Sequence, residues 1–219
     1  MIVTLDGPAG AGKSTAARAL AARLGWCYMD TGAMYRAVAL AALERGVPLD
    51  DGPLVAALAE QLAIEFCAGR VIADGRDVSA EIRTDRVTRA TRPVADAPPV
   101  RESLKRIQRR MAAGIDVVTE GRDQGSEVFP DAEVKVFLTA SPDVRARRRH
   151  EEEVGKGLAV SLEQVAGEQA RRDEGDRTRP IGKLVLATDA VVLDTDGLSR
   201  EQVVERLVEL VRSRGGVVR

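Results

Sequence analysis

The stretch Ile2-Val3-Thr4-Leu5-Asp6, followed by Gly7-Pro8-Ala9-Gly10-Ala11-Gly12-Lys13-Ser14, decides how this chain is expected to fold. Its first five residues are mostly apolar and include β-branched side chains, which predicts a short buried strand. The next eight fit the P-loop pattern, in which a glycine and four variable residues precede Gly-Lys-Ser. The alanine-rich residues 15–24 predict a helix that ends at Gly25. A strand, a glycine-rich turn and a helix in this order predict a phosphate-binding loop.

The residues of this loop suit a bound triphosphate. Glycines let the backbone approach a phosphate without a Cβ in the way, and successive N–H groups then form an anion nest. We expect Lys13 to reach the β- and γ-phosphates, and Ser14 to hold Mg²⁺ together with the phosphates of ATP. The predicted ATP-binding residues are Gly7, Pro8, Ala9, Gly10, Ala11, Gly12, Lys13, Ser14 and Thr15.

The composition limits the classes of partner. The net charge is −1, from 33 basic and 34 acidic residues, so we expect neither nucleic acid nor a membrane surface as a partner. We expect no signal peptide and no transmembrane segment, and the isolated Cys27 and Cys67 fit a reducing cytoplasm. The single histidine, His150, lies in a charged run, which predicts a solvated helix face and not a catalytic base or a zinc ligand.

The order of the predicted elements indicates an α/β fold, with a five-stranded parallel sheet and helices on both faces. After the first strand, further strands are expected near residues 26–30, 115–120, 134–138 and 190–194. Short antiparallel strands around an Asp74-Gly75 turn predict a small β insertion. A helix after residue 31 is expected to begin with Thr31 as its N-cap.

Three polar loops follow predicted strands, at residues 7–14, 30–36 and 120–125, and should meet at the carboxyl edge of the sheet. Five of the 33 basic residues are lysines, which leaves 28 arginines, the side chain suited to bidentate phosphate binding. We expect the acceptor phosphate to be bound by Arg36, Arg122 and Arg179. One P-loop with several arginines at the same edge predicts phosphoryl transfer between two phosphorylated ligands.

On these motifs the chain resembles the bacterial cytidylate kinases, within the nucleoside-monophosphate kinases. The motifs that carry the resemblance are the P-loop, Asp30-Thr31-Gly32-Ala33-Met34-Tyr35-Arg36, Pro99-Val100-Arg101, Gly121-Arg122-Asp123-Gln124-Gly125, and Arg172-Asp173 through Arg179. The resemblance implies transfer of the γ-phosphoryl group of ATP to CMP or dCMP with Mg²⁺, giving ADP and CDP or dCDP. It also implies one P-loop kinase domain over 1–219, acting as a monomer, with a monophosphate-binding insertion roughly at 53–92 and a helical lid roughly at 145–180.

The resemblance also implies which residues bind the acceptor. Those expected at the cytosine ring are Thr31, Arg101 and Asp123, those at its phosphate are Arg36, Arg122 and Arg179, and those near the sugar are Arg172 and Asp176. A carboxylate suits the exocyclic amine of cytosine, whereas uracil would present a carbonyl to it. The expected catalytic residues are Lys13, Arg122, Arg148 and Arg179. Asp30 and Glu120 are expected to reach Mg²⁺ through water.

The lid has a basis in composition, because basic and acidic residues are balanced within it, and Gly155 and Gly157 offer hinges. The spacing of Arg172, Asp176 and Arg179 predicts one shared helix face. We expect this segment to be mobile in the free protein and ordered when both nucleotides are bound.

Two other classes of P-loop protein are alternatives to a cytidylate kinase. A GTPase-like switch would read guanine with an Asn-Lys-x-Asp motif, and the chain contains no asparagine. A P-loop kinase acting on another monophosphate or small-molecule acceptor, such as shikimate, stays open. The chain departs from the resembled pattern at four positions, Arg92, Glu120, Gln124 and Gly175.

Overall fold

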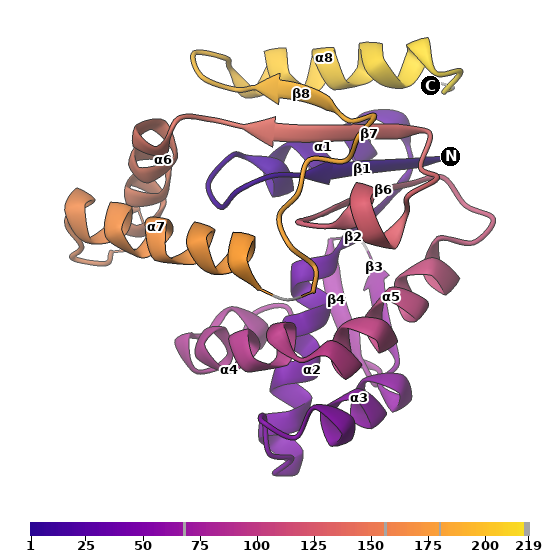
Figure 1. Ribbon diagram of the computed structural model, residues 1–219, viewed down its shortest axis with the longest axis vertical. Coiled ribbons are helices and arrows are strands. Elements are labelled where there is room, and N and C mark those ends of the chain that lie inside the picture. Colours follow the sequence, from indigo (N-terminus) through magenta and orange to yellow (C-terminus); the bar gives the residue numbers. More distant parts are fainter. Residues whose placement is uncertain (68, 156, 180, 217–219) are drawn as a thin grey trace. The chain divides into compact units, whose positions relative to one another are not determined.

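The computed structural model describes residues 1–67, 69–155, 157–179 and 181–216 (Figure 1). The chain divides into two compact units, one formed by Met1–Cys27 with Asp116–Arg219 and the other by Tyr28–Ile115. Lys156 and Pro180, which fall in the predicted lid, lie outside the described residues.

A five-stranded parallel sheet with flanking helices confirms the predicted fold class. Its strand order is β2-β6-β1-β7-β8, with β1 between β6 and β7. The strands are β1 (Ile2–Asp6), β2 (Cys27–Asp30), β6 (Val117–Gly121), β7 (Val134–Thr139) and β8 (Val191–Asp194). The helices of the first unit are α1 (Lys13–Leu24), the π-helical turn η2 (Gln124–Val128), α6 (Pro142–Val154), α7 (Leu162–Thr178) and α8 (Arg200–Ser213). The parallel register brings the carboxyl ends of β1, β6 and β7 to one edge of the sheet.

The core of the first unit explains why its central strand is apolar. Val3, Thr4 and Leu5 are fully buried, as expected for a strand that is covered on both faces of a parallel sheet. Helices α1 and α8 pack against each other, and Leu20 and Leu207 are among their buried residues. Full burial of a leucine or valine side chain contributes about 1.5–3 kcal/mol, so these positions hold the strand that precedes the P-loop.

The second unit contains the predicted antiparallel insertion. Its three-stranded sheet has the order β3-β4-β5, built from β3 (Ile64–Cys67), β4 (Arg70–Ala73) and β5 (Arg76–Asp77). Asp74 and Gly75 have φ of 48° and 77°, and two successive positive φ values suit a two-residue hairpin turn. The helices are α2 (Thr31–Arg45), α3 (Gly52–Gln61), the 3₁₀ turn η1 (Glu81–Arg83), α4 (Asp85–Asp96) and α5 (Pro98–Ala112).

Two local predictions were wrong. Asp30, and not Thr31, caps α2, because its carboxylate accepts a hydrogen bond from the Ala33 N–H at 2.9 Å. A carboxylate there also interacts favourably with the helix dipole, and Thr31 becomes the first helical residue. His150 is half-buried, and its Nε2 lies 3.1 Å from the Val160 carbonyl oxygen, so it does not lie on a fully solvated face.

Within the described part of the chain, no helix combines the length and the apolar character needed to span a membrane.

Candidate active site

The P-loop connects β1 to α1 and requires glycine where it approaches other parts of the first unit. At Gly7 (φ 147°) an added Cβ would lie 2.0 Å from the backbone oxygen of Leu138 on β7. At Gly10 (φ 78°) an added Cβ would lie 2.5 Å from Nε2 of Gln169 on α7. The glycines therefore serve close packing against β7 and α7 as well as access for a phosphate.

Lys13 is the first residue of α1 and is almost fully buried. Its Nζ donates a hydrogen bond to the Pro8 carbonyl oxygen at 2.8 Å, inside the loop. Burial, and next the charge of Arg122, lower the pKa of Lys13 well below its usual value. A bound phosphate would reverse this effect, because a nearby anion favours the charged form of an amine.

Ser14 and Glu120, both expected near Mg²⁺, lie in contact with each other. The Ser14 hydroxyl donates to Glu120 Oε1 at 2.7 Å, and Glu120 is buried near the carboxyl end of β6. Hydroxyl and carboxylate oxygens are ligands that Mg²⁺ accepts, so this pair fits the predicted metal. Thr15 follows at an exposed position.

Three of the predicted acceptor-site residues come together in the first unit. Arg122 Nε donates to Asp176 Oδ2 at 2.6 Å, and Arg179 Nη2 forms an ion pair with the other carboxylate oxygen. The side chains of Arg122 and Asp176 are 15% and 11% exposed, so this carboxylate offsets two largely desolvated guanidinium groups. Burial lowers the pKa of Arg122 despite four nearby acidic groups.

Arg172 and Asp176 lie one turn apart in the lid helix, as their spacing predicts, but Arg179 lies beyond the end of that helix. α7 ends at Thr178, and Arg179 follows with an extended backbone. The side chain of Arg172 is exposed, whereas that of Asp176 is buried. Arg172 is close enough to Lys13 that its charge helps to lower the lysine pKa. Asp123, beside Arg122, is buried.

The buried face of α7 is largely polar, which the sequence reasoning missed. Its residues Val165, Gln169, Asp173 and Asp176 repeat at helical spacing. Asp173 pairs with Arg145 of α6 at 2.6 Å, and both side chains are less than 10% exposed. The sequence marks this buried face by a spacing of four residues, from Val165 to Gln169 and from Gln169 to Asp173. The spacing is hard to recognise as a buried face because only Val165 is apolar.

Arg145 and Asp173 both contact the P-loop. Arg145 Nη1 donates to the Ala9 carbonyl oxygen at 2.9 Å, and the Ala9 N–H donates to Asp173 at 3.4 Å. Gln169 Nε2 donates to the Arg145 carbonyl oxygen at 3.2 Å. Helices α6 and α7 of the predicted lid are therefore joined to each other by a buried ion pair, and the same two side chains are hydrogen-bonded to the donor loop. The balanced charge of the lid sequence did not indicate this packing.

Arg148, predicted to be catalytic, contacts Thr195 next to the last strand of the sheet. Its guanidinium donates to the Oγ1 and the carbonyl oxygen of Thr195 at 2.9 and 2.8 Å. Thr195 is buried just after β8 and donates to the Thr139 carbonyl oxygen at 3.0 Å. These contacts hold α6 against the ends of β7 and β8.

The remaining predicted residues lie in the second unit, where Thr31 is buried at the start of α2. Arg36 donates to the Ile82 carbonyl oxygen at 3.2 Å and to Thr88 Oγ1 at 2.8 Å. The buried Arg101 guanidinium lies 5.5 Å from the centre of the Tyr35 ring. It also donates to the Ala95 carbonyl oxygen at 3.1 Å. Asp30 lies 3.8 Å from Arg83.

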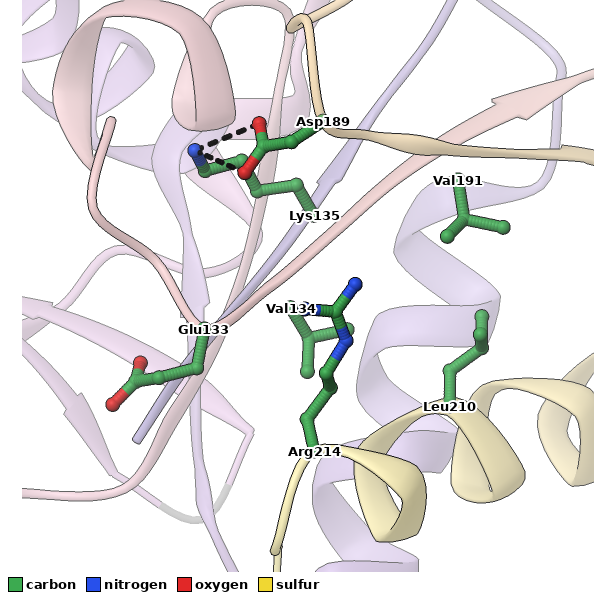
Figure 2. Close-up of a pocket in the computed structure, with 7 residues that line it drawn as sticks. All are labelled: Glu133, Val134, Lys135, Asp189, Val191, Leu210 and Arg214. Carbon is green, nitrogen blue, oxygen red and sulfur yellow. Dashed lines mark hydrogen bonds and ion pairs between the residues drawn. The ribbon is translucent and has the colours of Figure 1, made fainter.

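A small hollow elsewhere in the first unit is not part of this site. Figure 2 shows its lining residues, Glu133, Val134, Lys135, Asp189, Val191, Leu210 and Arg214. An ion pair between Lys135 and Asp189, 2.9 Å apart, borders it. The hollow lies beside Val134 at the amino end of β7, whereas the P-loop follows the carboxyl end of β1.

Comparison with known proteins assigns the chain to a family. The family model described as cytidylate kinase matches residues 3–213. A protein named cytidylate kinase from Rhodopirellula baltica is 49% identical over 97% of this chain and 93% of its own length. Its counterpart from Carboxydothermus hydrogenoformans is 46% identical over the full length of both chains. A cytidylate kinase from Mycobacterium leprae is 44% identical over 100% of this chain and 98% of its own.

Solved structures agree on the fold. The shikimate kinase of Bacteroides thetaiotaomicron has a TM-score of 0.51 at 17% identity, covering 97% of this chain and 98% of its own. An uncharacterized protein from Eubacterium ventriosum has a TM-score of 0.54 at 10% identity, covering 97% and 99%. At such low identity these similarities concern the fold alone.

Proposed function

The chain belongs to the cytidylate kinase family, and from that premise we propose how its residues divide the reaction. The enzyme transfers a phosphoryl group from ATP to CMP. The observation that carries the proposed division is the cationic cluster of the first unit. Asp176 pairs with both Arg122 and Arg179, and the charge of Arg122 helps to lower the pKa of Lys13. The cations of the donor loop and of the acceptor site are therefore proposed to act on one transferring group.

On the donor side, the P-loop amides and Lys13 bind the β- and γ-phosphates of ATP. Ser14 holds Mg²⁺, with Glu120 and Asp30 acting through water. When bound, the metal supplies charge neutralisation and orientation of the phosphates. The described residues contain no group of three or more His, Cys, Asp or Glu side chains that could hold a metal ion.

On the acceptor side, Arg122 and Arg179 exchange Asp176 for the phosphate of CMP. Asp176 pairs with both guanidinium groups, so an acceptor phosphate would replace one anionic partner with another. Arg36 provides a further contact to this phosphate, and Arg172 and Asp176 approach the sugar. Arg148 is proposed as a further catalytic arginine. A general base is not required, because the attacking phosphate oxygen is ionised at neutral pH.

The base is read by Asp123, Arg101 and Thr31. The Asp123 carboxylate accepts from the exocyclic amine of cytosine, and Arg101 donates to its ring acceptors. Uracil places a carbonyl against Asp123 and leaves a buried polar group unpaired, which gives strong discrimination. These base contacts do not involve the 2′ position, so they are the same for CMP and dCMP.

Acceptor specificity tests the proposal. We expect kcat/KM with ATP and Mg²⁺ to be far higher for CMP and dCMP than for UMP, AMP or GMP. Asp123→Asn should narrow the difference between CMP and UMP, because an amide can donate to the uracil carbonyl. Asp131→Asn is the matched control, since this exposed aspartate lies in the same connection between β6 and β7. A preference for AMP or GMP, or an Asp123→Asn enzyme as selective as the wild type, would contradict the assignment.

The overall organisation is also proposed. We infer one kinase domain over 1–219, in which 53–92 binds the monophosphate and 145–180 closes as a lid. We further propose a cytoplasmic monomer without nucleic-acid or membrane partners, supported by the balanced charge and by Cys27 and Cys67, which are free thiols. Sedimentation of the purified protein at several concentrations tests the oligomeric state.

A further inference from the structure

One buried carboxylate in the first unit has no part in the chemistry above. Asp6 is the last residue of β1 and is 5% exposed. Its Oδ1 accepts from the Gln124 N–H at 2.9 Å, and its Oδ2 accepts from the Gly125 N–H at 2.7 Å. These two N–H groups begin the π-helical turn η2, where amides lack intrahelical partners. Asp6 therefore caps, from β1, the turn that directly follows Arg122 and Asp123.

The turn relies on this external cap. Its own N-cap residue, Asp123, makes no capping hydrogen bond with its side chain. Gly125 also packs closely on β1, since an added Cβ would lie 2.9 Å from Thr4 Oγ1. The conformation of this loop is thus set largely by the end of β1, more than 115 residues away in sequence.

We propose that Asp6 is a positioning residue for the acceptor, whose charged carboxylate holds residues 121–125 so that Arg122 and Asp123 meet CMP in a fixed geometry. The inference rests on the proposed roles of Arg122 and Asp123. Asp6 also directly precedes Gly7, so the donor loop and the acceptor loop take their positions from the same strand end.

The electrostatic environment makes this contact sensitive to acid. Burial raises the pKa of Asp6 from 3.8 to about 6, against the effect of its two backbone hydrogen bonds. The charged groups that face it are Asp123, which raises the pKa, Lys13, which lowers it, and Arg122. Protonation turns one acceptor oxygen into an O–H donor that faces an N–H, so one of the two bonds is lost.

The kinetic test uses Asp6→Asn, with Asp116→Asn as the matched control. Asp116 precedes the amino end of β6, and its carboxylate is paired with the N-terminal amine. We expect Asp6→Asn to lower kcat/KM for CMP by about tenfold near neutral pH, as for the loss of one charge-assisted hydrogen bond. The KM for ATP should change by less than about twofold, and the preference for CMP over UMP should narrow, which a loss of overall stability would not cause.

The pH profile provides a second readout. The wild-type kcat/KM for CMP should fall as the pH drops through about 6, and Asp6→Asn should lack that component. Nucleotide phosphates also titrate near pH 6, but they act equally on both enzymes, so only the difference between the profiles reports on Asp6. Identical profiles, together with unchanged CMP kinetics in Asp6→Asn, would overturn the inference.

A third measurement does not depend on the variant or on activity. In the nucleotide-free wild type, the amide resonances of Gln124 and Gly125 should titrate with an inflection near 6. Amides that do not respond in this range would overturn the inference. Arg122→Ala separates the role of Asp6 from the role of the acceptor site itself. If it impairs CMP use and Asp6→Asn does not, only the inference fails, and if neither does, the proposed acceptor site fails as well.

Discussion

Replacing Arg145 with methionine is expected to destabilise the enzyme and to weaken its donor site. The guanidinium of Arg145 is paired with Asp173 at 2.6 Å, and the two side chains are 8% and 6% exposed. Methionine keeps much of the apolar stem but leaves the Asp173 carboxylate buried without its ion-pair partner, next to a long hydrogen bond from the Ala9 N–H. Removal of one partner from a buried ion pair costs about 3–5 kcal/mol. For a chain of this size that loss lowers Tm by about 10 °C.

A double-mutant cycle separates the uncompensated charge from the other contacts of Arg145. The Arg145→Met, Asp173→Leu double variant removes both charges, and we expect it to recover about 2 kcal/mol relative to Arg145→Met alone. The hydrogen bonds from Arg145 to the carbonyl oxygens of Ala9 and Ala140 are lost in both variants, so they cancel in the comparison.

Urea unfolding, with ATP kinetics on the same preparations, is the assay. Arg149→Met is the control, because Arg149 lies one turn later on α6 and its ion pairs with Glu152 and Glu153 involve a guanidinium that is 44% exposed. Exposed pairs contribute about 0–1 kcal/mol, so this variant should be nearly neutral. The KM for ATP should rise in Arg145→Met only, since Ala9 belongs to the P-loop. An Arg145→Met protein no less stable than Arg149→Met would refute the argument.

Three further predictions concern the donor site, pH and the lid. Lys13→Ala should reduce kcat by about a thousandfold while keeping a native circular dichroism spectrum, because the lysine charge acts on the transferring group. Lys183→Ala, at an exposed position, is the control and should be active. Comparable turnover in the two variants would contradict the donor site. The raised pKa of Asp6 means that its contribution to stability is fully present below pH 3.8 and is lost as the pH rises through about 6. The free energy of unfolding should therefore change by about 3 kcal/mol over this range, as measured by urea unfolding, and Asp6→Asn should lack this pH-dependent change. If the variant shows the same pH dependence as the wild type, Asp6 is not its source. Arg179→Ala should lower kcat as well as CMP affinity, and amide exchange in α7 should slow when a bisubstrate mimic binds; equal exchange in both states would reject the lid.

The parts of this protein that could be predicted from sequence are those set by neighbouring residues. The buried strand, the glycine turn and the following helix each need only a few adjacent residues, so 2–24 folds as expected. Capping boxes begin α7 at Ser161 and α8 at Ser199, and each needs only residues three apart. The Asp74-Gly75 turn is equally local.

The cap of α2 and the course of α7 were misjudged for a physical reason. Asp30 and Thr31 are both good N-cap residues, and only the backbone geometry decides which side chain reaches the Ala33 N–H. In α7 the apolar content is too low to mark a buried face, so the sequence indicates a face only through the spacing of charged residues such as Arg172. The buried face instead carries Gln169 and Asp173, which are tolerated there because each has a partner.

By itself, the sequence determined the class of sheet, the phosphate-binding loop and the side chains available for phosphoryl transfer. Tertiary structure decided which of those side chains meet. The Ala9 amide and Asp173 are 164 residues apart, and Asp6 and Gln124 are 118 apart, yet each pair forms a buried hydrogen bond. No local pattern specifies such a pairing, because it depends on which strand ends and helices the packing of the core brings together. The same packing removes water from these groups, and that desolvation gives Lys13, Arg122 and Asp6 their shifted pKa values.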